Sequence, residues 1–353
     1  MSAGPRQPLP DSILLGFDFY GAGNIGDDLT LAGFLEALRT LRPESLPRLY
    51  GICPHDVLSQ RRRFPEIEWN PPVLPEVACW AGVGDTPFQT TCGDWFLQYL
   101  RAALPRASHI PRRVLVAVGA ESEIEPQHAA FREIAAEFQR ISTRDEHSRR
   151  IMIDVLGIRA SQVHSGADLA NVSLAKLTAD SRSNRPIRMG LIIAGDTLSP
   201  ADLSETTAFL ATRNHPVSFI ACETRSGPHF ERGIHPLLES SLPAGRLPLR
   251  CCRYGEDSLP ELIRFIPECQ TVVGNRYHGL LAAAWAGCKV AAIGRSSKVT
   301  ALAKDLNVPL AMLPLSRERL AQVTSEAHTV PRDVLRSLAK RAIDGVAFCF
   351  GAD

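Results

Sequence analysis

Short apolar runs alternate with helical patterns along most of this chain, and this alternation constrains its fold more than any other feature. The run ILLGFDF at 13–19 precedes a stretch, 27–41, with apolar residues at helical spacing. The same order recurs up to the polar stretch LTADSRSNRPIR at 177–188, and a second series begins with MGLIIAG at 189–195. Strands that alternate with helices form parallel sheets with helices on both faces. The sequence therefore predicts an α/β protein.

Two lobes are expected, because 353 residues exceed what one ordinary core holds. We interpret 177–188 as the linker and place the lobes at 1–180 and 181–353, each with a Rossmann-like parallel sheet. The lobes are expected to face each other across a cleft. The last helical pattern, 331–348, is a candidate to cross back toward the first lobe.

Charge and cysteine usage exclude several classes of function. Lys and Arg total 39 against 38 Asp and Glu, so the net charge of +1 provides no field to hold nucleic acid, although a small anion site fits. The nine cysteines form no C-x-x-C pair, which favours reduced thiols over a zinc site. The first residues lack a secretory pattern, and the apolar stretch 279–294 is shorter than the roughly 20 residues of a membrane span. We expect a cytoplasmic protein without a transmembrane segment, at most peripheral at a membrane.

A glycine pattern, GAGNIG at 21–26, resembles the loop that binds the pyrophosphate of a dinucleotide. A strand precedes it and a helix follows it, as such a loop requires. However, Asp27 and Asp28 place two carboxylates in the first helical turn, where they would repel a phosphate. The acidic residue expected at the end of the second strand is also missing. These features disfavour a dinucleotide site, and Asp27 is left either as a helix cap or as a sugar ligand.

A stronger constellation lies in the second lobe, in two loops that each follow an apolar run. The first contains Asn275, Arg276, Tyr277 and His278, and the second contains Arg295, Ser296, Ser297 and Lys298. Both loops should leave the same carboxyl edge of a parallel sheet, where ligands of α/β proteins bind. A guanidinium, an ammonium and an imidazole around one pocket would suit a small dianion beside a proton donor. The alternatives are a structural ion pair for Arg276, a cap or packed ring for His278 and a solvated position for Lys298.

Four segments together resemble the polysaccharide pyruvyl transferase family. They are GNIGD at 23–27, RYHG at 276–279, the R-D-x-x-S element within ISTRDEHS at 141–148, and GAD at 166–168. They occur in the family's order and span most of the chain.

The resemblance implies a fold similar to GT-B glycosyltransferases and a reaction that places the pyruvyl unit of phosphoenolpyruvate on a sugar as a ketal. Carried over by position, His278 would act in proton transfer, and Arg276 would hold phosphoenolpyruvate with help from Arg295, Ser297 and Lys298. Asn24, Asp27 and Glu121 would bind the acceptor, a saccharide or a saccharide-lipid. The scheme needs no metal and no cofactor beyond this donor substrate.

The sequence departs from the family pattern after the first strand of the second lobe. Residues 190–196, GLIIAGD, supply no basic residue there, and Arg225, Arg253 and Arg295 are candidates to replace it. The loop 120–125 is unusually acidic, so Glu121 is either an acceptor ligand or part of an exposed charged loop. Arg144 and Asp145 are expected to form a structural ion pair at the lobe interface, and Asp168 to end a strand.

Two rival functions remain open at this point. A GT-B-like glycosyltransferase would need a nucleotide sugar, with a base pocket and a ribose-binding carboxylate in the second lobe. A degenerate family member would bind a sugar without turnover, as the missing basic residue near Ala194 and Gly195 suggests.

Overall fold

The computed structural model describes residues 10–91, 93–122, 124, 127–179, 185–195, 198–225, 227 and 230–351. By compactness the chain divides into a first unit, Met1–Gly21, Leu29–Ser173 and Ser337–Asp353, and a second unit, Ala22–Asp28 and Leu174–Arg336. The chain passes between the units after Gly21 and within three helices, α1 (Ile25–Leu41), α6 (Ala170–Leu177) and α13 (Arg332–Phe350). Residues 22–28, which the boundary after residue 180 assigned to the first lobe, therefore group with the second unit.

The first unit contains a seven-stranded parallel sheet in its described residues, in the order β3-β2-β1-β4-β5-β6-β7. Its strands are β1 (Ser12–Leu15), β2 (Arg48–Gly51), β3 (Ile67–Trp69), β4 (Cys79–Val83), β5 (Arg112–Val118), β6 (Arg140–Thr143) and β7 (Val163–Ser165). Its remaining helices are α2 (Val57–Arg63), α3 (Trp95–Arg106), α4 (His128–Ala136) and α5 (Glu146–Arg150), with a π-helical turn at Ile151–Val155 and a 3₁₀ turn at Ala160–Gln162.

The second unit repeats this architecture in the order β10-β9-β8-β11-β12-β13. These parallel strands are β8 (Ile187–Ile192), β9 (Ser218–Ala221), β10 (Leu249–Cys251), β11 (Cys269–Gly274), β12 (Lys289–Gly294) and β13 (Leu310–Met312), and β14 (His328–Thr329) pairs antiparallel to β12. Its helices are α7 (Pro200–Ala211), α8 (Glu231–Glu239), α9 (Leu259–Leu262), α10 (Tyr277–Trp285), α11 (Ser297–Leu306) and α12 (Arg317–Glu326).

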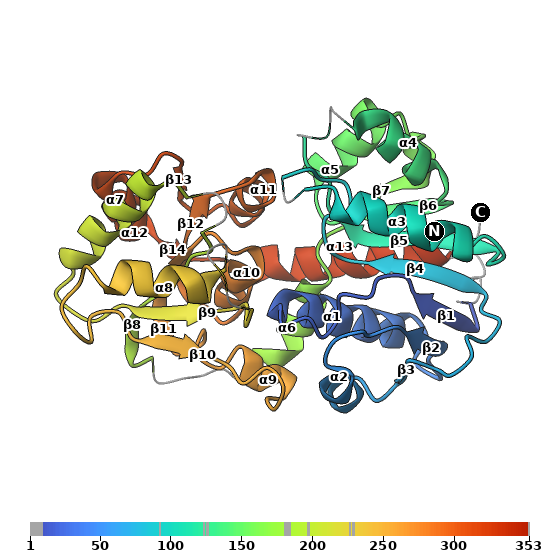
Figure 1. Ribbon diagram of the computed structural model, residues 1–353, viewed down its shortest axis with the longest axis horizontal. Helices are drawn as coiled ribbons and strands as arrows, with labels where there is room; N and C mark the ends of the chain where they lie inside the picture. Colours follow the sequence, from blue (N-terminus) through green and yellow to red (C-terminus); the bar gives the residue numbers. More distant parts are fainter. Residues whose placement is uncertain are drawn as a thin grey trace. The chain divides into compact units, whose positions relative to one another are not determined.

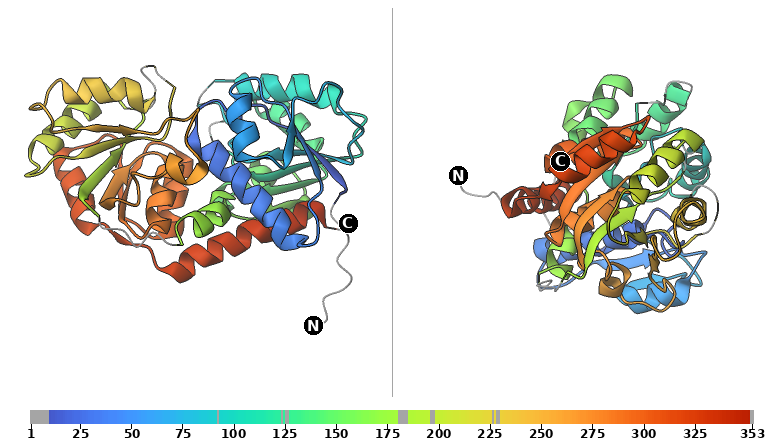
Figure 2. Two further views of the ribbon diagram at one scale, coloured as in Figure 1. Left: turned by 90° about the horizontal axis from the view of Figure 1, so that it is seen from below. Right: turned by 90° about the vertical axis from the view of Figure 1, so that its left-hand side faces the viewer.

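Helices cover both faces of each sheet, as Figures 1 and 2 show. Strand composition follows from this double cover: Val272 and Val273 of β11 and Ala291 and Ile293 of β12 are fully buried. Local signals also agree with the fold, since Ser199 and Asp202 form a capping box before α7, with Pro200 at its first turn. The predicted α/β architecture with two Rossmann-like parallel sheets is confirmed.

Two further sequence predictions concern the linker and a membrane-spanning segment. The predicted linker at 177–188 includes residues 180–184, which lie outside the described residues. Within the described part of the chain, no helix is both long and apolar enough to cross a membrane.

Gly33, in the middle of α1, approaches the backbone before α6 so closely that it has no room for a side chain. A Cβ atom at Gly33 would lie 1.8 Å from the carbonyl oxygen of Leu169, which already accepts a hydrogen bond from Val172. By contrast, a Cβ atom at Gly345 of α13 would meet the hydroxyl of Ser142 at 2.2 Å, and a hydroxyl can rotate away.

We therefore expect Gly33→Ala to destabilise the protein by about 1–3 kcal/mol through overpacking, although alanine is the better helix former. Gly345→Ala is the matched control and should cost less, because only a side chain has to move. Urea unfolding of both variants tests this. Equal midpoints for Gly33→Ala and the wild type would contradict the close backbone contact.

Candidate functional site

Two loops of the second unit leave the same edge of its sheet. The strands β11 and β12 pair in parallel, with Gly274 beside Ala292, and each leads directly into a helix, α10 or α11. Arg276 is the N-cap residue of α10, and Ser296 is that of α11. Parallel pairing therefore places residues 275–278 and 295–298 at one carboxyl edge, where α/β proteins bind their ligands.

Asn275 fixes the first loop to the end of β8. Its side-chain amide donates to the carbonyl of Ala194 and its oxygen accepts from the Ala194 N–H, both at 2.8 Å, and the side chain is buried. The sequence has no basic residue near Ala194, where the family pattern has one. Ala194 itself is fully buried. A long basic side chain has no space at Ala194. Gly195 follows, and Asp196 lies outside the described residues.

The glycine segment at the start of α1 pairs with the end of β9. Asn24 forms an antiparallel bridge with Glu223, the N–H of Thr224 donates to the carbonyl of Gly23 at 2.9 Å, and the N–H of Ile25 donates to Cys222 at 3.1 Å. Gly23 has φ +101°, and a Cβ atom there would lie 2.4 Å from the Thr224 hydroxyl. The glycines thus permit a left-handed turn and a close approach of two backbones.

Asn24 and Asp27 form one local structure at this helix start. The Asn24 side chain donates to the Asp27 carboxylate at 2.9 Å, and its oxygen accepts from the N–H of Gly26 at 3.1 Å. Asn24 therefore caps the helix, which explains the residue type without a ligand. Its predicted contact with an acceptor stays a prediction, as does that of Asp27.

His278 lies directly against Gly26. A Cβ atom at Gly26 would be 1.9 Å from Nδ1 of His278, so only glycine leaves room for the imidazole. The His278 ring also packs edge-on to Tyr277, with ring centroids 5.1 Å apart, and the His278 side chain is partly exposed. The GNIGD and RYHG segments, far apart in sequence, thus meet at this imidazole.

Arg276 is held between two buried carboxylates. Its Nη2 lies 3.3 Å from Oε2 of Glu223, and its Nε lies 2.9 Å from Oε1 of Glu231. Glu223 is 1% exposed and Glu231 is fully buried, whereas the Arg276 side chain retains 18% exposure. The ion pair considered for Arg276 therefore exists, and it fixes the guanidinium at the loop.

Arg225 completes this network from the segment after β9. It binds Glu223 through two parallel hydrogen bonds of 2.8 Å each, the bidentate geometry that suits a guanidinium and a carboxylate. Its guanidinium also lies 4.7 Å from the ring centre of Phe230. Arg225 was a candidate replacement for the missing basic residue, and the structure places it in the same cluster as Arg276.

Electrostatic effects extend the cluster to the second loop. Burial raises the pKa of Glu231, and the positive charges of Arg276 and Arg295 oppose this rise. Hydrogen bonding to Glu223 raises the pKa of Arg225, and Asp27 also contributes. The set of Asp27, Glu223, Arg225, Glu231, Arg276 and Arg295 is called the charge cluster below. Its three guanidiniums and three carboxylates balance formally.

The start of α11 offers further polar groups. The hydroxyl oxygens of Ser296 and Ser297 are buried and have no hydrogen-bond partner within the described part of the chain. They lie at a helix N-terminus, where unpaired N–H groups and the helix dipole favour an anion. Lys298 is partly exposed on the same turn. This turn therefore has the chemistry of a phosphate site.

Glu121 belongs to the first unit and is buried, at 4% exposure. Its carboxylate accepts a hydrogen bond from the hydroxyl of Thr91. The alternative of an exposed charged loop is therefore wrong for Glu121, because its carboxylate is taken up by a neighbouring hydroxyl. Glu123 and Glu125 lie outside the described residues.

The R-D-x-x-S element supports the Glu121 loop from behind. Asp145 caps α5 by accepting from the N–H of Ser148 at 2.6 Å, and the Ser148 hydroxyl accepts from the N–H of Ala120 at 3.0 Å. The expected pairing of Arg144 with Asp145 is present at 3.4 Å, with both side chains buried. Asp168 likewise caps a helix, since it accepts from the N–H of Ala170 at 2.8 Å.

Sequence reasoning identified most of these residues, but it missed Glu231. Glu231 begins α8, in a segment that carries no recognisable motif. Its only signal is an acidic residue in a first helical turn, a position that usually reflects the helix dipole. Among the described residues, no group of three or more His, Cys, Asp or Glu side chains is arranged to hold a metal ion.

Comparison with known proteins decides the family. The model of the polysaccharide pyruvyl transferase family matches residues 24–297, which include the loop 275–278, the second loop up to Ser297 and the glycine segment from Asn24 on. The chain belongs to this family. The match confirms the resemblance seen in the motifs of this pyruvyl transferase family member. No functionally curated protein matches the sequence significantly.

Solved structures of similar fold and low sequence identity include UDP-GlcNAc 2-epimerases and a protein in complex with UDP-glucose. UDP-GlcNAc 2-epimerase from Neisseria meningitidis, solved with UDP-GlcNAc, has a TM-score of 0.58 at 11% identity and covers 95% of this chain and 99% of its own. The epimerase from Methanocaldococcus jannaschii has 0.58 at 10%, covering 95% and 98%. Anabaena HepE in complex with UDP-glucose has 0.55 at 13%, covering 96% and 95%. These likenesses confirm the GT-B-like fold of the family member.

The contact between Gly26 and His278 can be tested by a double-mutant cycle. Gly26→Ala should push the imidazole aside and destabilise the protein by about 1–3 kcal/mol. In a His278→Ala background the same change should cost much less, because the clashing ring is gone. Denaturant unfolding of the four proteins measures the coupling, and additive effects would show that the two residues are not in contact.

The role of Glu223 as the shared partner of two guanidiniums makes a second prediction. Glu223→Gln keeps the shape but removes the charge, so it should cost about 1–3 kcal/mol of unfolding free energy. Glu256→Gln is the matched control, because Glu256 pairs with Arg253 on the surface at 70% exposure and should matter little. Equal stability of both variants would contradict a structural role for the buried network.

Proposed function

We propose that this protein transfers the enolpyruvyl unit of phosphoenolpyruvate onto two hydroxyls of a sugar in a polysaccharide precursor, forming a cyclic ketal and releasing phosphate. The family match supports the class of reaction. One structural observation supports the site most strongly: His278 lies against Gly26, two residues after Arg276, whose guanidinium two buried carboxylates hold in place.

The proposed reaction begins with a proton on the methylene carbon of phosphoenolpyruvate. His278 donates this proton, which turns the methylene into a methyl group and leaves an oxocarbenium-like centre at C2. A sugar hydroxyl attacks C2 and loses its proton to a base. The C2–O bond to phosphate then breaks, a second hydroxyl closes the ketal, and its proton leaves with the phosphate. An imidazole suits the first step because its ordinary pKa lies near neutrality.

The donor's two anionic groups need fixed cations. We assign the carboxylate and phosphate of phosphoenolpyruvate to Arg276 together with Arg295, Ser297 and Lys298. A guanidinium already held by Glu223 and Glu231 requires no reorganisation when charge develops on the departing phosphate. The buried, unpartnered hydroxyl of Ser297 at the start of α11 is the kind of donor that such an anion needs.

The acceptor is proposed to be a saccharide or a saccharide-lipid, with Asp27 and Glu121 receiving its hydroxyls and Asn24 orienting Asp27. The reaction consumes phosphoenolpyruvate as a substrate and calls for no separate cofactor. We place it in the cytoplasm, where phosphoenolpyruvate is produced, with no nucleic acid involved.

Phosphate release tests the proposal. Purified protein should release phosphate from phosphoenolpyruvate only when a suitable saccharide acceptor is added, and His278→Ala should lower kcat/KM by about 10²–10⁴-fold, as loss of a general acid does. Circular dichroism checks that the variant is folded. Full turnover by this variant would exclude His278 as the acid.

The rival functions give different results in the same assay. Consumption of a nucleotide sugar without phosphoenolpyruvate would indicate a glycosyltransferase. Acceptor binding without phosphate release, across a broad acceptor panel, would indicate a sugar-binding protein.

A further inference from the structure

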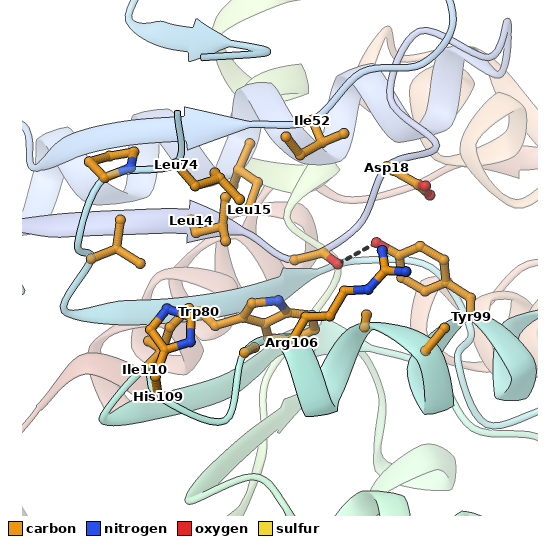
Figure 3. A pocket seen from close by; sticks show the side chains of 16 residues that line it. Leu14, Leu15, Asp18, Ile52, Leu74, Trp80, Tyr99, Arg106, His109 and Ile110 are labelled. Carbon is orange, nitrogen blue, oxygen red and sulfur yellow. Dashed lines mark hydrogen bonds between the residues drawn. The ribbon is translucent and has the colours of Figure 1, made fainter. Parts of the chain in front are cut away.

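An apolar pocket in the first unit lies outside every residue assigned above. It has a volume of about 390 Å³, within the range of sites that bind small organic ligands. Its floor is formed by Leu14 and Leu15 of β1 and by Trp80 of β4, and one wall is formed by Ala103 and Arg106 of α3. Figure 3 shows these side chains gathered around one space.

The sheet topology explains why this space is open. The helix α1 follows β1 toward β2, whereas α3 follows β4 toward β5, in the opposite direction along the sheet. Right-handed crossovers place such helices on opposite faces. The described segment between β3 and β4 (residues 70–78) contains no helix, and Leu74, Pro75 and Val77 of this segment line the pocket together with α3. An uncovered strip of sheet therefore remains.

The two ends of the pocket differ in chemistry. Asp18, Tyr99 and Arg106 lie toward the carboxyl edge of β1, where the Tyr99 hydroxyl donates to the Gly16 carbonyl at 2.8 Å. Burial raises the pKa of Asp18. In Figure 3 the Arg106 side chain runs along the pocket toward the end marked by Tyr99 and Asp18, and Ile110 marks the opposite end.

The rim exposes aliphatic side chains to water. Leu74 is 51% exposed and Ile52 is 36% exposed, and both line the pocket. Such a surface gains free energy when another apolar group covers it. The walls offer few hydrogen-bonding groups, so a bare sugar would lose its bonds to water there. Arg106, which is exposed on α3, would bind a phosphate at the polar end.

We propose that this pocket binds the hydrocarbon chain of an amphiphilic phosphate, with the chain along Leu14 and Trp80 and the phosphate at Arg106. If the reaction proposed above is correct, this amphiphile is the lipid-linked saccharide acceptor, and Asp18 receives a hydroxyl of its sugar. That second part rests on the proposed function, whereas the binding of the amphiphile does not.

Binding of decyl phosphate, below its micelle concentration and without phosphoenolpyruvate, tests the pocket independently of turnover. Titration calorimetry should show saturable binding, and inorganic phosphate and decanol should each bind at least tenfold more weakly. Ala103→Phe fills the pocket and should weaken decyl phosphate binding at least tenfold, and Ala102→Phe serves if that variant fails to fold. Gln98→Phe, which adds the same bulk to an exposed position of α3 outside the pocket, should bind like the wild type.

The headgroup contact has its own variant. Arg106→Gln should weaken decyl phosphate binding at least fivefold and leave decanol binding unchanged, and Arg101→Gln, on the same helix but outside the pocket, should change neither. Equal binding by Ala103→Phe and the wild type would overturn the proposal, as would inorganic phosphate binding as tightly as decyl phosphate. Self-association that Ala103→Phe abolishes would instead assign the surface to a second copy of the chain.

The link to the acceptor is measured separately. If the amphiphile is the acceptor, Ala103→Phe should lower the ratio of kcat/KM for a lipid-linked acceptor to that for the free saccharide at least tenfold. An unchanged ratio, with decyl phosphate binding lost, would overturn the acceptor assignment. The binding of an amphiphilic phosphate in the pocket would still stand. If the wild type released no phosphate with any acceptor, only the proposed function would be overturned.

Discussion

The buried carboxylate of Glu223 is the group on which the geometry of the second unit's site depends. A carboxylate removed from water must be paired, and Glu223 meets this requirement with two guanidiniums, Arg225 and Arg276. It follows β9, while Arg276 follows β11, so the pair connects loops on either side of β8. The backbone of Glu223 also bridges to Asn24, which brings the start of α1 to the same place. One residue thus joins three distant segments, and the contact of His278 with Gly26 forms beside it.

The near balance of charge in this cluster determines what it can do. Three guanidiniums without carboxylates would repel one another and move, whereas paired guanidiniums stay where they are needed. Because Glu223 and Glu231 partly neutralise the positive charge of Arg276, a dianionic ligand would also need hydrogen-bond donors outside the cluster. The start of α11, with two buried hydroxyls and Lys298, supplies such donors along the same sheet edge. The charge cluster and the start of α11 thus lie at the sheet edge that also carries His278.

The motifs in this protein have clear structural roles. The glycines at 21–26 match a dinucleotide loop in spacing, but Gly23 makes room for the Thr224 hydroxyl and Gly26 for the His278 ring. The R-D-x-x-S element caps a helix with Asp145 and holds the loop of Glu121 with Ser148. In the first unit, the reversal of strand order beside β1 leaves the apolar pocket under α3. In each case the path of the backbone accounts for the feature.

The sequence by itself determined the α/β class, the two parallel sheets, the family and the two loops after β11 and β12, because these depend on periodicity and on short-range spacing. It correctly offered an ion pair for Arg276 and one between Arg144 and Asp145, because a charged side chain that is buried must be paired. Only the tertiary structure decided which carboxylates hold Arg276, that Glu121 is buried, and that residues 22–28 belong with the second unit. The partners of a buried charge lie wherever the chain returns in space, and no pattern of neighbouring residues encodes that return. For this reason Glu231, which follows no motif, was found only in the folded structure, where the start of α8 meets Arg276.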